Sequence, residues 1–323
     1  MHNSCAVMKM QKQIGMTEIY ESSKGLLENA GPGSKTAVIV AGHRFDESQK
    51  PEDERICYDP YAVHFVTPEI RELNKDPLKA KAMLESLGNV GILLLGMGNS
   101  TRARVRYFDD FVKASIDKGL EQLVILGAGY DTRAYRIEGP HDRGNFKVFE
   151  VDHPTTQGAK KEKIKEIFGE LPDHVMYVPV DLRTEILGER LLGNGYDRSK
   201  QTLFIMEGLL MYLPPKAVDE ILSSIVNNSA KGCSIIFDYY PESVVNGNSE
   251  LEVGRITHDY LAKIGEPLLF GIRDGMVEEF LRKRGFSEVC NVTSEDYKNA
   301  YFYGKNENRP VSSLLSFAHA EVK

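Results

Sequence analysis

The chain is poor in the features that mark several large classes of protein. Its four cysteines, Cys5, Cys57, Cys233 and Cys290, lie far apart and form no Cys-x-x-Cys pair, so we expect neither a disulfide framework nor a metal site. No apolar run approaches the roughly 18 residues that span a bilayer, and the first residues lack the apolar core of a signal peptide. We therefore expect a cytoplasmic protein with no membrane partner.

Positively charged residues are also fewer than negatively charged ones. The chain has 40 Lys and Arg against 47 Asp and Glu, which gives a net charge of −7 at pH 7. A nucleic-acid-binding domain usually carries a basic surface, so no nucleic-acid partner is expected. The lysines of residues 160–166 alternate with acids and predict a solvent-exposed helix face instead. A small-molecule substrate is the expected partner, and the sequence leaves the oligomeric state open.

One stretch of 30 residues organises the rest of the chain. The apolar run Leu123–Leu126 breaks into Gly127-Ala128-Gly129, a segment with helical spacing follows over 133–137, and a second apolar run ends at Asp152. Glycine allows the backbone to turn tightly and to approach a ligand closely. The order strand, glycine turn, helix, strand and carboxylate is typical of a site for a nucleoside-bearing cofactor, although Gly-x-Gly alone is also a common structural turn.

The details of this stretch bear on which nucleoside it binds. Asp131 or Thr132 can cap the helix after the turn, and Asp152, about 20 residues farther on, suits the two hydroxyls of a ribose. The dinucleotide fingerprint requires a third glycine, which would fall near Thr132, and none is present from Tyr130 to Ile137. A diphosphate is disfavoured, and a cofactor without phosphate, such as S-adenosylmethionine, is favoured.

The remaining pattern predicts an α/β fold. Further strands are expected over 175–180, 203–206, 234–239, 286–292 and, as a last edge strand, 301–303. Helices are expected over 35–45, 77–87, 101–112, 154–168, 217–227 and 276–284, and an apolar glycine-rich patch over 91–98. Alternating strands and helices indicate parallel pairing, in which the strand ends meet at one edge. Gly129, Asp152, Asp181 and Glu207 should therefore lie together.

These motifs resemble the leucine carboxyl methyltransferase family. The resemblance rests on residues 126–133 and 149–154, together with Tyr58-Asp59-Pro60-Tyr61, Ala103-Arg104-Val105, Asp181-Leu182-Arg183, and Glu207 with Tyr212-Leu213. It implies a Rossmann-like, class I methyltransferase sheet that is mostly parallel and has about seven strands. It also implies a helical lid region over 1–115, before a core over 116–323, and S-adenosyl-L-methionine as the cofactor.

The resemblance also implies roles for individual residues. Arg104 would bind the methionine carboxylate of the cofactor, Asp152 its ribose, and Glu207 would lie near its amine. Gly127 and Gly129 would pass under the methionine, and Asp181 and Leu182 would flank the adenine. The expected cofactor contacts are Arg104, Gly127, Ala128, Gly129, Asp131, Asp152, His153, Asp181, Leu182 and Glu207.

The methyl acceptor is not determined by the sequence. The lysine that the eukaryotic enzyme uses upstream of its Asp-Pro-Tyr element has no aligned counterpart, so a protein C-terminal leucine is not implied. A carboxylate or hydroxyl of a small molecule is expected, with the carboxylate favoured by the resemblance. A hydroxyl acceptor would need a general base, for which the sequence offers Tyr212, Tyr239, Tyr240 or His153. Tyr212, which follows a predicted strand end, is the expected catalytic residue. The alternatives are an NAD-dependent oxidoreductase and a non-catalytic adenosyl-ligand binder.

Overall fold

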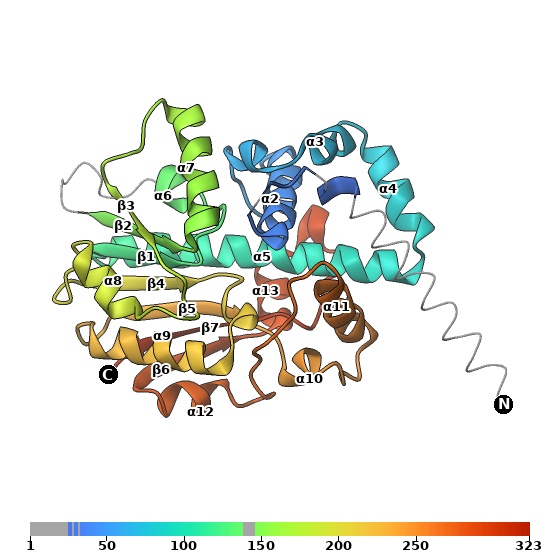
Figure 1. The fold of residues 1–323 in the computed structure, drawn as a ribbon. Coiled ribbons are helices and arrows are strands. Elements are labelled where there is room, and N and C mark those ends of the chain that lie inside the picture. Colours follow the sequence, from blue (N-terminus) through green and yellow to red (C-terminus); the bar gives the residue numbers. More distant parts are fainter. Residues whose placement is uncertain (1–24, 28, 32, 138–145) are drawn as a thin grey trace.

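A seven-stranded sheet lies at the centre of the computed structural model, which describes residues 25–27, 29–31, 33–137 and 146–323 (Figure 1). The strand order is β3-β2-β1-β4-β5-β7-β6. The strands are β1 (Gln122–Leu126), β2 (Lys147–Asp152), β3 (Val175–Pro179), β4 (Thr202–Met206), β5 (Ser234–Tyr239), β6 (Phe286–Val292) and β7 (Ser316–Val322). β1 to β5 pair in parallel, and β7 is antiparallel to both β5 and β6. The predicted mostly parallel sheet is confirmed.

Both faces of the sheet are buried, which explains the continuous apolar runs. In β1, Val124 and Leu126 face one hydrophobic cluster, whereas Leu123 and Ile125 face another. The period of two is that of an extended strand, and parallel strands covered on both faces are apolar throughout.

Helices cover the two faces. The first cluster is completed by α8 (Leu187–Gly193), α9 (Pro215–Asn227) and α12 (Val277–Arg282). The second is completed by α5 (Asn89–Asp117), α6 (Arg133–Arg136), α11 (Glu252–Lys263) and α13 (Ser294–Tyr301) (Figure 1). The remaining α-helices of the described core are α7 (Pro154–Phe168) and α10 (Glu242–Val245).

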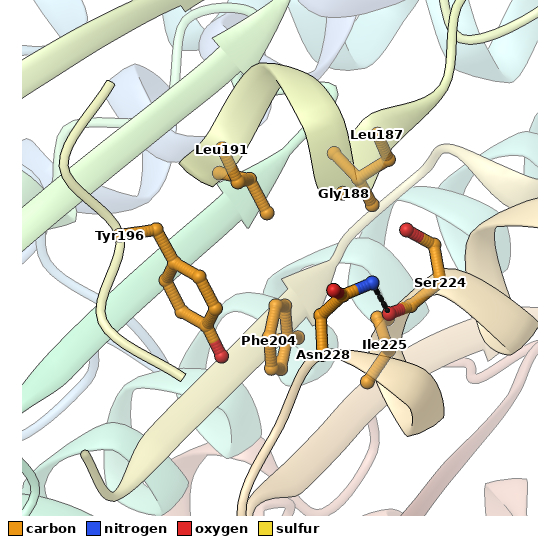
Figure 2. A pocket seen from close by; sticks show the side chains of 8 residues that line it. All are labelled: Leu187, Gly188, Leu191, Tyr196, Phe204, Ser224, Ile225 and Asn228. Atoms are coloured by element: carbon orange, nitrogen blue, oxygen red, sulfur yellow. Dashed lines mark hydrogen bonds between the residues drawn. The ribbon is translucent and has the colours of Figure 1, made fainter. Parts of the chain in front are cut away.

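The packing between α8, α9 and β4 leaves only a small void. Figure 2 shows its lining, in which Leu187, Leu191, Phe204 and Ile225 supply apolar contacts and Asn228 Nδ2 donates to the carbonyl of Ser224 at 2.9 Å. Its volume of about 10 Å³ is enough for at most one water molecule. This void is a packing feature and no ligand site.

Three helices that precede α5 lie beside the carboxyl ends of the strands (Figure 1). They are α2 (Lys35–Ser48), α3 (Pro68–Asn74) and α4 (Pro77–Ser86), and both α2 and α4 pack on α5. Ser34 caps α2 as expected, since its Oγ accepts the Ala37 N–H at 3.2 Å. The boundary expected near residue 115 falls inside α5, whose Phe108 and Val112 pack in the same cluster as the strands.

Two expectations about local structure are wrong. The helix expected over 101–112 begins earlier, at Asn89, so the glycine-rich patch over 91–98 is part of α5. Gly91 and Gly98 lie so close to Leu84 and His43 that there is little room for a Cβ at either position. Tyr301 ends α13, and the segment 301–303 is no strand. The last strand is β7, which inserts between β5 and β6. His319 and Glu321 interrupt its apolar pattern and hide it from sequence analysis.

Gly91 and Gly96 offer a matched test of this helix packing. A Cβ on Gly91 would lie 1.9 Å from the carbonyl oxygen of Leu84, whereas a Cβ on Gly96 would meet nothing closer than 3.4 Å. Gly91→Ala is expected to lower the free energy of unfolding by about 1 kcal/mol through overpacking, and Gly96→Ala to leave it unchanged or raise it slightly. Urea denaturation measures both, and equal effects would contradict the packing.

No helix among the described residues is both long and apolar enough to cross a membrane.

Candidate active site

A cavity of about 1130 Å³ opens over the carboxyl ends of the parallel strands. One side of its wall comes from the segments after β1 to β5, and the other from α2, α3, α4, the first half of α5, and α11. The volume exceeds the roughly 300–1,000 Å³ of a site for one small molecule, so cofactor and acceptor can share it. All the residues expected from sequence line it, namely Arg104, Gly127, Ala128, Gly129, Asp131, Asp152, His153, Asp181, Leu182, Glu207 and Tyr212.

The glycine turn after β1 requires its glycines. Gly127 has φ +62° and Gly129 has φ +43°, a region that favours glycine. A Cβ on Gly127 would also lie 2.7 Å from Leu209 Cδ1, and one on Gly129 would be 3.6 Å from Ala37 Cβ of α2. The turn therefore packs against Leu209, in the loop after β4, and against α2. Because the two glycines carry no side chain, the backbone of the turn lies directly at the cavity wall.

Asp152 is held at the end of β2 with its carboxylate next to this turn. Its Oδ2 accepts the Gly129 N–H at 2.5 Å, and its Oδ1 accepts the His153 N–H at 2.7 Å. Burial raises the pKa of Asp152, against these two backbone donors. Each oxygen retains a lone pair, which is what a pair of ribose hydroxyls needs. Binding of the ribose by Asp152 stays a prediction.

Three further predicted residues support the local backbone as well as the cavity wall. Asp131 Oδ1 accepts the Arg133 N–H at 2.7 Å, so Asp131, one of the two expected caps, serves the start of α6. His153 Nδ1 accepts the Thr155 N–H at 3.3 Å and caps α7. Asp181 Oδ1 accepts the Arg183 N–H at 3.0 Å. Each of these bonds holds the local backbone directly after β1, β2 or β3.

Arg104 and Glu207 form the centre of a buried charge network. Arg104 Nε donates to Glu207 Oε1 at 3.0 Å, and its Nη1 donates to Asp238 Oδ2 at 2.6 Å. Asp238, which was not predicted, also accepts the Gly208 N–H through Oδ1 at 2.6 Å. Arg104 Nη2 has no hydrogen-bond partner in the described part of the chain and lies beside Gly208. Binding of the methionine carboxylate by Arg104, for which this nitrogen would be the donor, stays a prediction.

Arg133 is a second buried arginine that sequence reasoning missed. Its side chain is 1% exposed and contacts three carboxylates, Asp109 at 2.7 Å, Asp131 at 2.5 Å and Glu207 at 2.6 Å. Burial alone would raise the pKa of Glu207, but Arg133 and Arg104 lower it. Glu207 is therefore ionised and lies between Arg104 and Arg133, and it lines the cavity.

Tyrosine hydroxyls occupy the part of the wall formed by the ends of β4 and β5. Tyr212 and Tyr240 line the cavity together with Thr36 of α2 and Glu266 after α11. Burial raises the pKa of both tyrosines well above the usual value. The Glu266 carboxylate accepts the Lys35 N–H at 2.7 Å and the Thr36 N–H at 3.2 Å, which ties α2 to the segment after α11.

His43 is a cavity residue that the sequence did not single out. It projects from α2 against Gly98 of α5, where a Cβ would lie 2.9 Å from His43 Cε1. Burial, together with the charges of Arg102 and Arg104, lowers the pKa of His43 to about 3. The only sequence signal was a histidine two helical turns after Thr36 on the predicted helix over 35–45. The structure makes it a neutral imidazole on the cavity wall.

The pKa of His43 leads to a prediction about acid stability. Because the folded state resists protonation, the unfolded state binds more protons between pH 6.5 and 3, and stability is lost as the pH falls through that window. Between pH 7 and 5.5, we expect the free energy of unfolding of the wild type to fall by about 1 kcal/mol more than that of His43→Asn. Urea denaturation at both pH values measures this difference. Glu47, whose pKa is lowered to about 2, loses its stabilising contribution only as the pH falls below 4.5, so it does not affect this window. Parallel losses in the two proteins would contradict the assignment.

Comparison with known proteins agrees with this site. The sequence profile of the family described as leucine carboxyl methyltransferase matches residues 37–226. YktD of Bacillus subtilis, whose name places it provisionally among S-adenosyl-L-methionine-dependent methyltransferases, is 29% identical over 68% of this chain and 72% of its own length. A similarly named protein of Mycobacteroides abscessus is 32% identical over 81% of this chain and 86% of its own length.

A solved structure shows that the fold is shared. A protein of Thermobifida fusca, described provisionally as a methyltransferase, is similar with a TM-score of 0.54 and 13% identity, over 92% of this chain and 97% of its own. The family match favours methyl transfer over both alternatives that the sequence left open, the oxidoreductase and the non-catalytic binder. The chain belongs to the leucine carboxyl methyltransferase family, and it is an S-adenosyl-L-methionine-dependent methyltransferase.

Proposed function

We propose that the protein methylates an oxygen of a small molecule, and that this oxygen belongs to a carboxylate. The observation that supports a carboxylate is the protonation state of Tyr212, Tyr240 and His43, which line the cavity. The pKa values of Tyr212 and Tyr240 are raised by burial, and that of His43 is lowered to about 3. A hydroxyl acceptor needs a base whose pKa lies near the working pH, whereas a carboxylate is already ionised.

The residues of the strand edge fit the cofactor. S-adenosylmethionine, when bound, supplies a methyl group on a positively charged sulfonium. Asp152 offers acceptor lone pairs for a ribose, and Arg104 Nη2 offers a donor for a carboxylate. In the network around Glu207, three arginines (104, 133 and 136) meet four carboxylates (109, 131, 207 and 238). Three positive and four negative charges leave one negative charge, which suits a cationic ligand.

The chain's own contribution to the reaction is then positioning. Methyl transfer is an in-line displacement, whose rate depends on holding the acceptor oxygen in line with the methyl group and on excluding water. Helix α2, which packs on α5 and contacts Glu266 at its first residues, covers the edge on which the cofactor residues lie. Tyr212, which follows β4 and lines the cavity, would orient the acceptor through its hydroxyl.

A methyl-uptake screen tests the proposal. The full-length protein is incubated with S-adenosylmethionine labelled in the methyl group and with panels of carboxylic acids and hydroxylated compounds. We expect label in acids, as a methyl ester that mild alkali hydrolyses. Label that accumulates only in alkali-stable products, such as ethers, would overturn the carboxylate assignment.

Tyr212→Phe separates acceptor binding from cofactor binding. Loss of one hydroxyl hydrogen bond is expected to reduce kcat/KM for the acceptor about tenfold, with the Kd for S-adenosylhomocysteine unchanged. Tyr239→Phe is the matched control, because the Tyr239 hydroxyl donates to Asn291 at 2.9 Å and does not line the cavity. Equal kcat/KM values for Tyr212→Phe and the wild type would remove Tyr212 from the acceptor site.

A further inference from the structure

The helical side of the cavity presents a large aliphatic surface. We call this part, formed by α2, α3, α4, the first half of α5, and α11, the helical chamber. Aliphatic side chains from four of these elements and from the α4–α5 connection project into it. They include Leu73, Leu84, Leu87, Leu94, Met97 and Ile256. By contrast, the strand side presents Asp152, Asp181 and Glu207.

The charged side chains of the helical chamber form ion pairs within the described part of the chain, where Glu47 also pairs with Arg309 at 2.7 Å. Arg102 pairs with Asp46 at 2.5 Å and with Glu47 at 2.8 Å, and Lys50 also pairs with Glu47 at 2.8 Å. The other pairs are Arg44 with Asp59 at 3.0 Å and Lys81 with Glu85 at 3.7 Å. A ligand that carried charge into the chamber would have to compete with these pairs, at a cost in desolvation.

The chamber also has appreciable length. Thr36 and His43 lie on the same face of α2 and both line the cavity. They are seven residues apart, which is about 10 Å along a helix. Thr36 lies at the end of α2 that Glu266 contacts, near Tyr212 and the strand edge, and His43 lies next to α5. An elongated ligand can therefore extend from the strand edge into the chamber along α2.

We propose that the acceptor is an amphipathic monocarboxylic acid, whose hydrocarbon body occupies the helical chamber while its single carboxylate stays at the strand edge. The carboxylate rests on the proposed function, and the hydrocarbon body rests on the chamber itself. Burial of each additional methylene strengthens binding about fourfold until the chamber is full. A second charged group on the acceptor weakens binding, because it would have to be desolvated and to compete with the existing ion pairs of the chamber.

Binding is measured first, without turnover. Equilibrium dialysis gives the Kd of labelled butanoate, octanoate and dodecanoate for the full-length protein in the presence of saturating S-adenosylhomocysteine. We expect octanoate to bind at least 50-fold more tightly than butanoate, and octanedioate to bind more weakly than octanoate. Equal affinities along the series, or tighter binding of the diacid, would overturn the proposal.

Methyl transfer to the same acids then separates the two proposals. Chain-length-dependent binding without ester formation would leave the chamber assigned and refute carboxyl methylation. Ester formation with kcat/KM highest for butanoate, or for a peptide ending in leucine, would support carboxyl methylation and refute the amphipathic acceptor. Only the two proposals together predict ester formation with a kcat/KM that rises from butanoate to octanoate.

Two positions on α5 supply matched variants. Leu94 is half-buried in the chamber wall, whereas Ile92 on the same helix is 57% exposed and lies outside the cavity wall. Leu94→Asp is expected to weaken the binding of octanoate at least tenfold and to leave the Kd of S-adenosylhomocysteine unchanged. Ile92→Asp is expected to change neither Kd. Should Leu94→Asp fail to fold, Leu84→Trp fills the chamber without charge and should weaken dodecanoate more than butanoate. Octanoate binding unaffected by a folded chamber variant would overturn the assignment.

Discussion

Replacing Arg133 with methionine is expected to lower the free energy of unfolding by about 3–5 kcal/mol, the usual cost of breaking a buried ion pair from one side. Arg133 contacts three carboxylates from different parts of the fold, on α5, on the turn after β1 and after β4. After its loss, Asp109 keeps Arg136 and Glu207 keeps Arg104. Among the described residues, Asp131 keeps no cation within hydrogen-bonding distance, so it bears most of the cost.

The pH dependence of this loss identifies its cause. Burial would raise the pKa of Asp131, but Arg133 and Lys160 lower it to about 2 in the wild type, so its stabilising contribution is present above its unfolded value of 3.8. Without Arg133, we expect the pKa of Asp131 to rise above that value. Protonation of Asp131 then removes its unpaired buried charge as the pH falls. The difference in the free energy of unfolding between the variant and the wild type therefore becomes smaller from pH 8 to pH 5.

Urea denaturation at several pH values measures the gap. Arg106→Met is the control, because Arg106 is 46% exposed and makes its ion pair with Asp110 on its own helix. An exposed pair contributes less than about 1 kcal/mol, so this variant should stay close to the wild type. A loss for Arg133→Met no larger than that of Arg106→Met would show that the network does not stabilise the fold.

The strand edge was predictable from sequence because it depends on local pattern and topology. Apolar runs that end in a glycine or an acid define β1 to β4, and parallel pairing brings their carboxyl ends to one edge. Asp152, Asp181 and Glu207 therefore line one cavity although they lie far apart in the chain. Asp238 carries a similar signal near the end of the predicted strand 234–239 and could have been added.

The helical side of the site was not predictable in the same way. Whether Arg102, Arg104 and Arg106 face the core or the solvent depends on what packs on α5, and only Arg106 is largely exposed. Gly91 and Gly98 are poor helix residues by intrinsic preference. At these positions, however, a Cβ would lie too close to Leu84 and to His43. Tertiary packing overrides propensity here, which is why the first half of α5 and the role of His43 emerged only from the structure.

Replacing Asp152 with alanine is expected to weaken S-adenosylhomocysteine binding by at least about 2 kcal/mol, or roughly 30-fold, because two hydrogen bonds to a buried carboxylate are lost. The substitution also removes the acceptor of the Gly129 N–H, which could disturb the glycine turn by itself. A double-mutant cycle with an analogue that lacks the ribose 2′-hydroxyl distinguishes the two causes. If Asp152 binds the ribose, calorimetry will show that the analogue binds the wild type more weakly than the parent ligand does, but that both bind Asp152→Ala with similar affinity. If only the turn is disturbed, removal of the hydroxyl will have the same effect in both proteins, and the ribose must then be bound elsewhere along this edge.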